Sequence, residues 1–212
     1  MSEPASTLLA VTSKTPLTLR ERNKLRVRDD LVDAVTTELA DSGAGLCALD
    51  DVLRRAGLSK GTFYNHFPGG RDQLLLLAYE QIGAEFQRDS TRLRDGGNSP
   101  SEKIMAFADA YFAICADPRK GKLYSVAEPA LAPILAPAIG RTSGWVRAEI
   151  TDDLRATPRF RGKKGHSRAD ACAILLVGAI REAGRRTYVD ATSAPPLRAE
   201  LLSIVTSIIG GE

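Results

Sequence analysis

Apolar residues recur at helical spacing over most of the chain. Between Leu31 and Leu39 they appear at every fourth position, which places their side chains on one face of an α-helix. Upstream, Thr18 and Glu21 have the spacing of a capping box, in which each side chain satisfies a free backbone N–H of the other residue. The pattern predicts a first helix from about residue 19 to residue 41.

Two shorter helical patterns follow, over residues 49–56 and 60–66. Gly57 stands where the first of them must stop, because a residue without a Cβ atom adopts the left-handed conformation at low cost. Ser59 is placed to cap the second, since its hydroxyl can accept from a backbone N–H of the first turn. Helix, tight turn and helix within about twenty residues form a helix-turn-helix, which presents its second helix to the major groove of DNA.

The next elements are also helical. A helix is expected from Arg71 to about Arg94, and the sequence RDGGNSP then ends it. Ser99 and Glu102 form a second capping box with a proline at the first helical position, which begins another helix.

The second half of the chain predicts shorter and longer helical pieces. Four prolines between Asp117 and Gly140 favour short helical pieces and turns there, because proline cannot donate a backbone hydrogen bond. A helix follows over residues 145–154, and residues 158–165 are expected to form a basic loop. Two long helices are then expected. The first covers residues 168–188 with Ser167 as its cap, and the second covers residues 196–209. The fold class is therefore all-α.

Charge is unevenly distributed, although the net charge is only +3. Six basic residues lie between Lys14 and Arg28, against the single acid Glu21. Placed just before a helix-turn-helix, this basic run can neutralise DNA phosphates. The alternative interpretation is a solvated, flexible tail.

Other classes of protein find little support. No run of apolar residues is long enough to span a membrane and the N-terminus does not resemble a secretory signal, so we expect a cytoplasmic protein. Cys47, Cys115 and Cys172 have no metal-site spacing, which predicts no metal and no cofactor; a thiol redox sensor remains an alternative. The motifs GxSxG, HExxH and the P-loop are missing, so we expect no enzyme, and His166 is read as a surface residue.

The segment AGLSKGTFYNHF (residues 56–67), followed by Arg71 and Asp72, resembles the TetR family of bacterial transcription regulators. The resemblance covers roughly residues 19 to 80. It implies a flexible basic arm over residues 1–18 and a helix-turn-helix DNA-binding domain over residues 19–70. Residues 71–212 would form a helical domain for effector binding and dimerisation, with residues 71–95 as the connecting helix.

The resemblance also implies which residues contact DNA. Phe63 and Phe67 are expected in the core, where they would fix the recognition helix. Thr62 and Asn65 are suited to base edges, and the others to the backbone or to close approach. The expected DNA-contacting residues are Lys60, Gly61, Thr62, Tyr64, Asn65, His66 and Arg71. Ala48 departs from the family pattern, because a threonine usually caps this helix.

For the remainder, the resemblance implies a homodimer through the two C-terminal helices, a palindromic operator in double-stranded DNA, and an apolar or amphipathic small-molecule effector. The family's majority are repressors that the effector releases. The alternative is a DNA-binding protein of the same fold that answers to a protein partner or acts architecturally. The candidate pocket residues are Met105, Tyr111, Phe112, Tyr124 and Trp145, each of which has plain core packing as its alternative.

Overall fold

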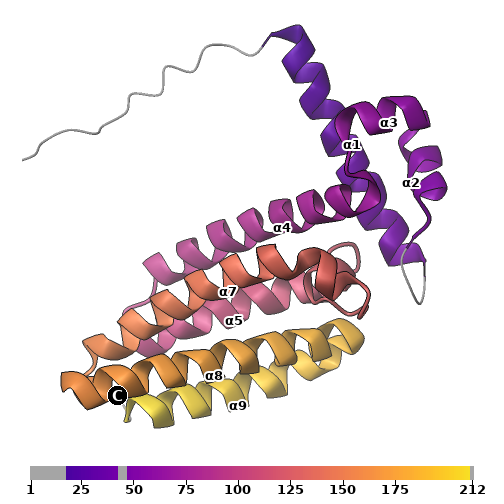
Figure 1. Cartoon of the computed structure of the whole chain (residues 1–212). Coiled ribbons are helices and arrows are strands. Elements are labelled where there is room, and N and C mark those ends of the chain that lie inside the picture. The colour runs from indigo at the N-terminus through magenta and orange to yellow at the C-terminus, as the bar shows by residue number, and fades with distance from the viewer. Residues whose placement is uncertain (1–17, 43–46, 211–212) are drawn as a thin grey trace, which may run out of the picture.

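We describe the fold from a computed structural model, which covers residues 18–42 and 47–210. The expected arm over residues 1–17 lies outside the described residues. Over the described ranges the chain forms nine α-helices and two short 3-10 helices, and no strand. The all-α fold class is confirmed. Figure 1 shows a small helical unit, α1 to α3, standing on one end of a larger layered bundle.

The small unit consists of α1 (Leu19–Asp41), α2 (Leu49–Ala56) and α3 (Lys60–His66). Gly57 adopts the expected left-handed conformation, with φ of 66°. The Ser59 hydroxyl accepts from the Thr62 N–H at 3.2 Å. Gly57 therefore ends α2, and Ser59 begins α3, where the sequence predicts. As the second helix of a helix-turn-helix, α3 lies across α1 (Figure 1).

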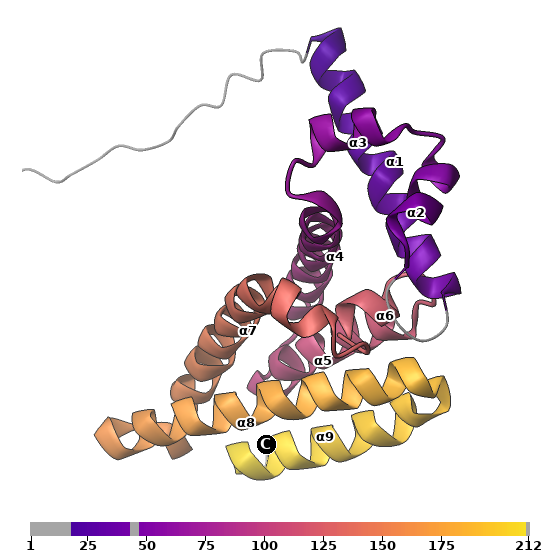
Figure 2. The same cartoon turned by 45° about the vertical axis from the view of Figure 1, so that its right-hand side comes forward.

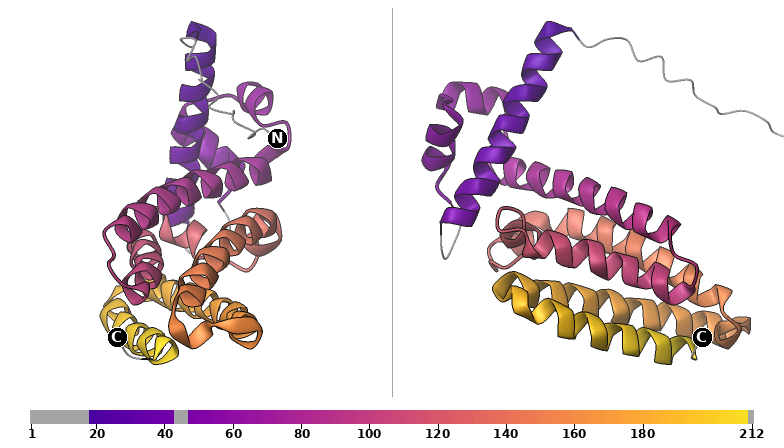
Figure 3. Two further views of the ribbon diagram at one scale, coloured as in Figure 1. Left: turned by 90° about the vertical axis from the view of Figure 1, so that its left-hand side faces the viewer. Right: turned by 180° about the vertical axis from the view of Figure 1, so that it is seen from behind.

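The small unit is joined to the bundle by α4 (Gly70–Asp95), a helix of 26 residues that contacts α1 near its start and α5 and α7 further along. After the predicted break, α5 (Pro100–Ala116) begins with the Ser99 and Glu102 capping box. α5 is apolar on nearly every face, because it runs through the centre of the bundle (Figure 3).

The middle of the chain corrects one expectation. After the single turn α6 (Gly121–Tyr124), the helix α7 (Leu131–Ala156) runs without a break through two prolines. Pro133 lies in its first turn, where a backbone N–H has no intrahelical partner to lose. Pro137 lies inside the helix and removes one hydrogen bond without ending it. The expectation of short pieces is therefore wrong for residues 131–140, and the helix expected over residues 145–154 is the second part of α7.

The basic segment over residues 158–165 is also not a loop. It forms a 3-10 turn (Pro158–Phe160) and then the start of α8 (Gly162–Val189), so α8 begins before Arg168 and Ser167 lies inside it. Gly165 makes this possible, because a Cβ atom there would lie 2.4 Å from the Phe160 carbonyl carbon. His166 is exposed on this first part of α8, as expected for a surface residue.

A second 3-10 turn (Ala191–Ser193) leads into α9 (Ala194–Ile209). Figures 2 and 3 place α8 and α9 side by side in the layer farthest from α1–α3. One cluster of buried apolar side chains runs through the whole chain, from α1 to α9. No helix in the described ranges has the length and apolar character that crossing a membrane requires.

Candidate nucleic-acid interface

The outer face of α3 carries the side chains that the sequence assigned to DNA. Tyr64 is 49% exposed, Asn65 is exposed, and Gly61 adds no bulk. The opposite face is anchored, because Phe63 is fully buried and its ring stacks on that of Phe67 with centroids 5.6 Å apart. The structure thus presents a firmly seated helix with a polar outer face.

Thr62 is turned partly inward. Its hydroxyl lies 3.0 Å from the Ser59 hydroxyl, which also receives the Thr62 N–H. That contact belongs to the helix cap. Thr62 can still offer its methyl group to a thymine methyl.

Lys60 begins α3 and reaches back to α2. Its Nζ atom lies 2.8 Å from Asp50 Oδ1, and this hydrogen bond raises the pKa of the ammonium group. Both side chains are largely exposed, so the pair contributes little to stability. A DNA phosphate can therefore replace Asp50 as the partner of Lys60 at small cost.

His66 and Arg71 are less open than the rest of the set. His66 is half-buried, and its Nδ1 atom is buried without a hydrogen-bond partner among the described residues. Arg71 donates from Nη1 to the Cys47 carbonyl at 3.2 Å, which ties the start of α4 to the segment before α2. Arg71 thus has a structural contact, and only its remaining N–H groups are available to a phosphate.

Most of the basic run belongs to a helix. Arg20, Arg22, Lys24 and Arg26 are exposed on the first half of α1, and the guanidinium of Arg28 lies over the Phe67 ring at 5.2 Å. The interpretation as a flexible tail is therefore wrong from residue 19 onward, while Lys14 lies outside the described residues. Figure 1 shows this half of α1 projecting past α3, so that its positive charge lies beside the recognition helix.

A second candidate site is a cavity in the bundle between α4 and α8. Its volume is about 30 Å³. Tyr124 is 1% exposed, and its hydroxyl is buried without a hydrogen-bond partner among the described residues. The lining residues are Tyr79, Phe86, Phe107, Tyr111, Tyr124, Thr142, Ser143, Val146, Val177, Ile180 and Arg181.

Of the five side chains expected to line a pocket, the structure brings two to this cavity, Tyr111 and Tyr124. Trp145 lies just outside it, in edge contact with Phe107 at 5.3 Å, and lines a neighbouring groove between α4 and α7. Met105 and Phe112 are buried but are not among the lining residues.

Sequence reasoning missed most of the lining, although α4 carried a signal. Tyr79, Gly83 and Phe86 follow one another at spacings of four and three residues, which puts them on one helix face. The contribution of Arg181 from α8 depends on how α8 packs on the other helices, which no local pattern states.

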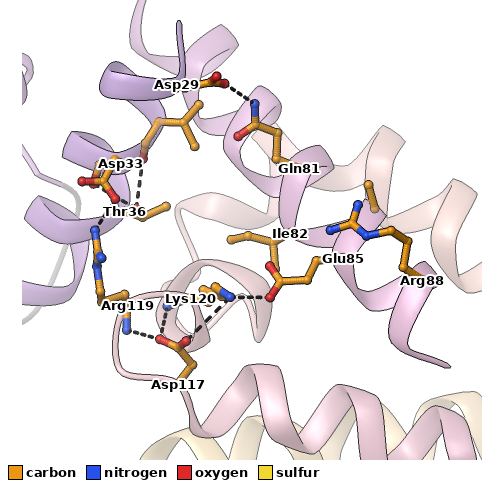
Figure 4. Close-up of a pocket in the computed structure, with 12 residues that line it drawn as sticks. Asp29, Asp33, Thr36, Gln81, Ile82, Glu85, Arg88, Asp117, Arg119 and Lys120 are labelled. Carbon is orange, nitrogen blue, oxygen red and sulfur yellow. Dashed lines mark hydrogen bonds and ion pairs between the residues drawn. The ribbon is translucent and has the colours of Figure 1, made fainter. Parts of the chain in front are cut away.

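Polar contacts join the small unit to the bundle close to this cavity. Arg119, just before α6, is ion-paired with Asp33 of α1 and donates to the Thr37 hydroxyl at 2.8 Å. Lys122 on α6 is 2% exposed and donates to the Ser42 hydroxyl at the end of α1, at 3.1 Å. Arg119 and Asp33 also line an open groove between α1, α4 and residues 117–120, which Figure 4 shows from close by. The volume of this groove is about 750 Å³.

Two of the three cysteines are buried in surroundings that keep the thiol protonated. Burial raises the pKa of the Cys115 thiol to about 12 and also raises that of Cys47. Cys172 is half-buried. A thiol that stays protonated reacts slowly, which argues against Cys47 and Cys115 as redox sensors. In the described part of the chain no three His, Cys, Asp or Glu side chains gather as a metal site would require.

No protein-family model matches the chain. Among curated proteins it is similar to the HTH-type transcriptional regulator LmrA of Bacillus subtilis, with 28% identity over 38% of this chain and 43% of LmrA. It is also similar to the HTH-type regulator AlkX of Mycobacterium tuberculosis, with 29% identity over 74% of this chain and 76% of AlkX. An uncharacterised HTH-type regulator of the same bacterium is matched over 29% of its length. The chain thus spans less than half of LmrA and of this uncharacterised regulator.

Solved structures agree on the fold. A transcriptional regulator from Rhodococcus sp. superimposes with a TM-score of 0.70 at 19% identity, covering 86% of this chain and 95% of that one. A TetR-like regulator from the same genus has a TM-score of 0.68 at 18% identity, covering 92% and 100%. RolR, solved with resorcinol, has a TM-score of 0.60 at 17% identity, covering 89% and 95%. These relatives are transcriptional regulators, and the solved structures among them show that the chain shares their fold.

Proposed function

This chain is TetR-like in its fold and in the motif of its recognition helix, and from this premise we propose that it is a homodimeric repressor that a small molecule releases from a palindromic operator. One observation carries the DNA-binding part: α3 presents Tyr64 and Asn65 outward from a base anchored by Phe63. We place Lys60, Gly61, Thr62, Tyr64, Asn65, His66 and Arg71 at the DNA. The site of action is the cytoplasm, where bacterial DNA lies.

Selection of bound sequences from a random duplex pool tests this proposal directly. A palindromic consensus is the expected result, because a two-fold dimer reads two half-sites. Sequence-blind binding would favour the architectural alternative instead.

Two substitutions on α3 are expected to separate affinity from specificity. Lys60→Ala should weaken binding to all sequences alike and reduce the slope of log K against log salt by about 1, because one phosphate is no longer neutralised by a lysine. Asn65→Ala should cost about 1–3 kcal/mol at one base position and relax the preference there. Fluorescence anisotropy at several salt concentrations measures both effects.

Lys163→Ala is the matched control, because it removes an exposed lysine at the start of α8. It should leave the salt slope and the base preference unchanged. If the α3 variants behave like Lys163→Ala, α3 is not the recognition helix.

The dimer proposal rests on an apolar outer face of α8 and α9. Ile174 is 54% exposed, Leu175 is 71% exposed, and Ile204 of α9 is 48% exposed. Apolar side chains exposed on these two neighbouring helices are unfavourable in water and suit burial against a second copy of the same face. A four-helix interface of α8 and α9 from two chains would bury it and would tie two α3 helices to one scaffold.

Leu175→Asp is expected to give a monomer, because a buried charge at the centre of this face would be unpaired. Sedimentation velocity should show the mass of one chain, and operator affinity should fall by roughly 100-fold or more, since a single reading head cannot benefit from bivalent binding. Leu93→Asp is the control, because Leu93 is 41% exposed on α4, away from this face. A dimeric Leu175→Asp protein would contradict the interface.

Release by an effector is supported by the position of α6. This one turn carries Tyr124 into the cavity and Lys122 onto the end of α1, and Arg119 just before it pairs with Asp33. A ligand that displaces Tyr124 therefore also disturbs the contacts that orient α1. A hundredfold loss of operator affinity needs only about 2.7 kcal/mol of such coupling.

A further inference from the structure

Aromatic rings form much of the lining of the cavity. The ring centroid of Phe86 lies 6.1 Å from that of Tyr111 and 5.9 Å from that of Tyr124, and Tyr79 stacks on Tyr124 at 4.9 Å. Phe107 lies 6.3 Å from Phe86. These rings contact one another, so a ligand ring would pack against them as the cavity widens, and aromatic pairs gain free energy beyond the area that they bury.

Hydroxyl groups that can donate hydrogen bonds also line this cavity. Burial raises the pKa of the Tyr124 hydroxyl, so the group keeps its proton and can donate, yet it has no partner among the described residues. Gly83 keeps the space beside it open, because a Cβ atom there would lie 3.8 Å from the Tyr124 hydroxyl and 3.9 Å from Thr142 Oγ1. The Ser143 hydroxyl also lines the cavity. A ligand that accepts hydrogen bonds here would satisfy the buried hydroxyl.

Arg181 is an exposed arginine that contributes to the lining of the cavity, and no acid is among the described lining residues. Its positive charge lowers the pKa of the Tyr79 and Tyr111 hydroxyls, against the larger effect of burial, so the guanidinium lies near both phenol groups. No ion pair joins Arg181 to a carboxylate within residues 18–42 and 47–210. A carboxylate on this side of the cavity would pair with the exposed guanidinium in the planar geometry that arginine binds well.

Size restricts the ligand further. The cavity of about 30 Å³ is roughly one fifth of a cavity of about 150 Å³ that admits benzene. A single ring therefore requires the cavity to widen about fivefold, to the size that admits benzene, and long chains or fused rings require a still larger opening of the bundle. The open groove of about 420 Å³ between α4 and α7 shares Tyr79 and Thr142 with the cavity and offers a way in.

We infer that this cavity widens to bind a small aromatic acid, with its single ring packed against Phe86, Tyr111 and Tyr124 and its carboxylate accepting from the Tyr124 hydroxyl and facing Arg181. The inference rests on the proposed function, since it names the class of the effector. Entry of the ring would press on Tyr124, and therefore on α6.

Calorimetry of the purified full chain with three matched compounds tests the inference, using benzoate, benzamide and cyclohexanecarboxylate. Benzoate should bind. Benzamide, with the same shape but no charge, and cyclohexanecarboxylate, with the charge but no aromatic ring, should each bind about tenfold more weakly, a factor that corresponds to 1.4 kcal/mol. Equal binding of benzoate and benzamide, or no benzoate binding at millimolar concentration, would overturn the inference. Because only the parent protein is used, the result does not depend on whether a variant folds.

Variants then locate the site. Arg181→Gln should abolish the preference for benzoate over benzamide, and Tyr124→Phe should weaken benzoate by about fivefold, the effect of one hydrogen bond. Arg185→Gln is the control, because Arg185 lies one turn along α8, exposed and paired with Glu182. If Arg185→Gln and Arg181→Gln have equal effects on benzoate, the carboxylate does not bind in this cavity.

Operator binding, measured in parallel, separates this inference from the proposed function. If benzoate binds with the expected pattern but the operator is retained, the ligand class stands and release by the effector fails. If a neutral or non-aromatic molecule releases the operator while benzoate does not bind, release stands and the ligand class is wrong.

Discussion

Replacing Arg94 by Met is expected to lower the free energy of unfolding by about 3 kcal/mol, because it leaves a largely buried carboxylate without its partner. Arg94, near the end of α4, donates to Asp153 at 2.6 Å and to Glu149 at 2.9 Å, both on α7. It also donates to the Lys103 carbonyl and lies 4.7 Å above the Phe107 ring. The side chains of Arg94 and Asp153 are only 13% and 12% exposed, so solvent screens this pair weakly. Urea denaturation followed by circular dichroism measures the change.

Arg92→Met is the matched control for this prediction. Arg92 lies two residues earlier on α4 and pairs with Asp89 at 3.5 Å, but its side chain is 76% exposed. Its removal should cost less than about 0.5 kcal/mol. Arg94→Lys should fall between the two, since it keeps the charge but lacks the planar fork. Equal effects of Arg92→Met and Arg94→Met would show that the Arg94 cluster does not stabilise the bundle.

The Arg94 cluster also bears on the proposed release. α4 has 26 residues and is about 39 Å long, fixed to α7 at its far end by Arg94 and joined to α3 at its near end. A helix anchored at one end turns about that anchor, so a small displacement near the cavity grows toward α3. Glu85 of α4 also pairs with Lys120, just before α6, so α4 and α6 are linked beside the groove of Figure 4. The structure thus offers two connections from the cavity to the small unit, one through α6 and one through α4.

The elements that sequence predicted well are those set by local chemistry. Gly57, Ser59 and the Ser99 and Glu102 capping box act within one helical turn, and the structure confirms each of them. The burial of Phe63 and Phe67, which the family resemblance implied, is also confirmed. The missing side-chain cap at Ala48 is confirmed in the same way.

The errors arose where packing outweighs local preference. Pro137 costs one hydrogen bond, which the burial of Leu135, Ala138 and the rest of the inner face of α7 offsets. The start of α8 depends on a close approach of Gly165 to Phe160, which no sequence spacing reveals. Most of the cavity lining escaped prediction for the same reason, since it comes from five helices and depends on how they pack on one another.

Gly184→Ala is expected to lower the free energy of unfolding by about 2 kcal/mol, even though alanine is the better helix former by about 1 kcal/mol. Gly184 lies inside α8, and a Cβ atom there would lie 2.2 Å from a carbon of the Tyr111 ring and 3.1 Å from the Cys115 sulfur. Tyr111 is buried and donates to the Tyr124 carbonyl at 3.4 Å, so it cannot yield without disturbing α6. Thermal and urea unfolding of the variant measure the change in stability.

Gly140→Ala separates helix propensity from packing, because Gly140 lies inside α7 with no atom within 4 Å of an added Cβ. It should raise the free energy of unfolding by about 0.5–1 kcal/mol. In a Tyr111→Leu background, where the ring is removed, the penalty of Gly184→Ala should fall to near zero, because contacting residues are energetically coupled. If Gly184→Ala stabilises the parent protein as Gly140→Ala does, α8 does not approach α5 as closely as the structure shows. In that case α8 would lie farther from α5 and from the cavity, and Arg181 of α8 would not contribute to the ligand site.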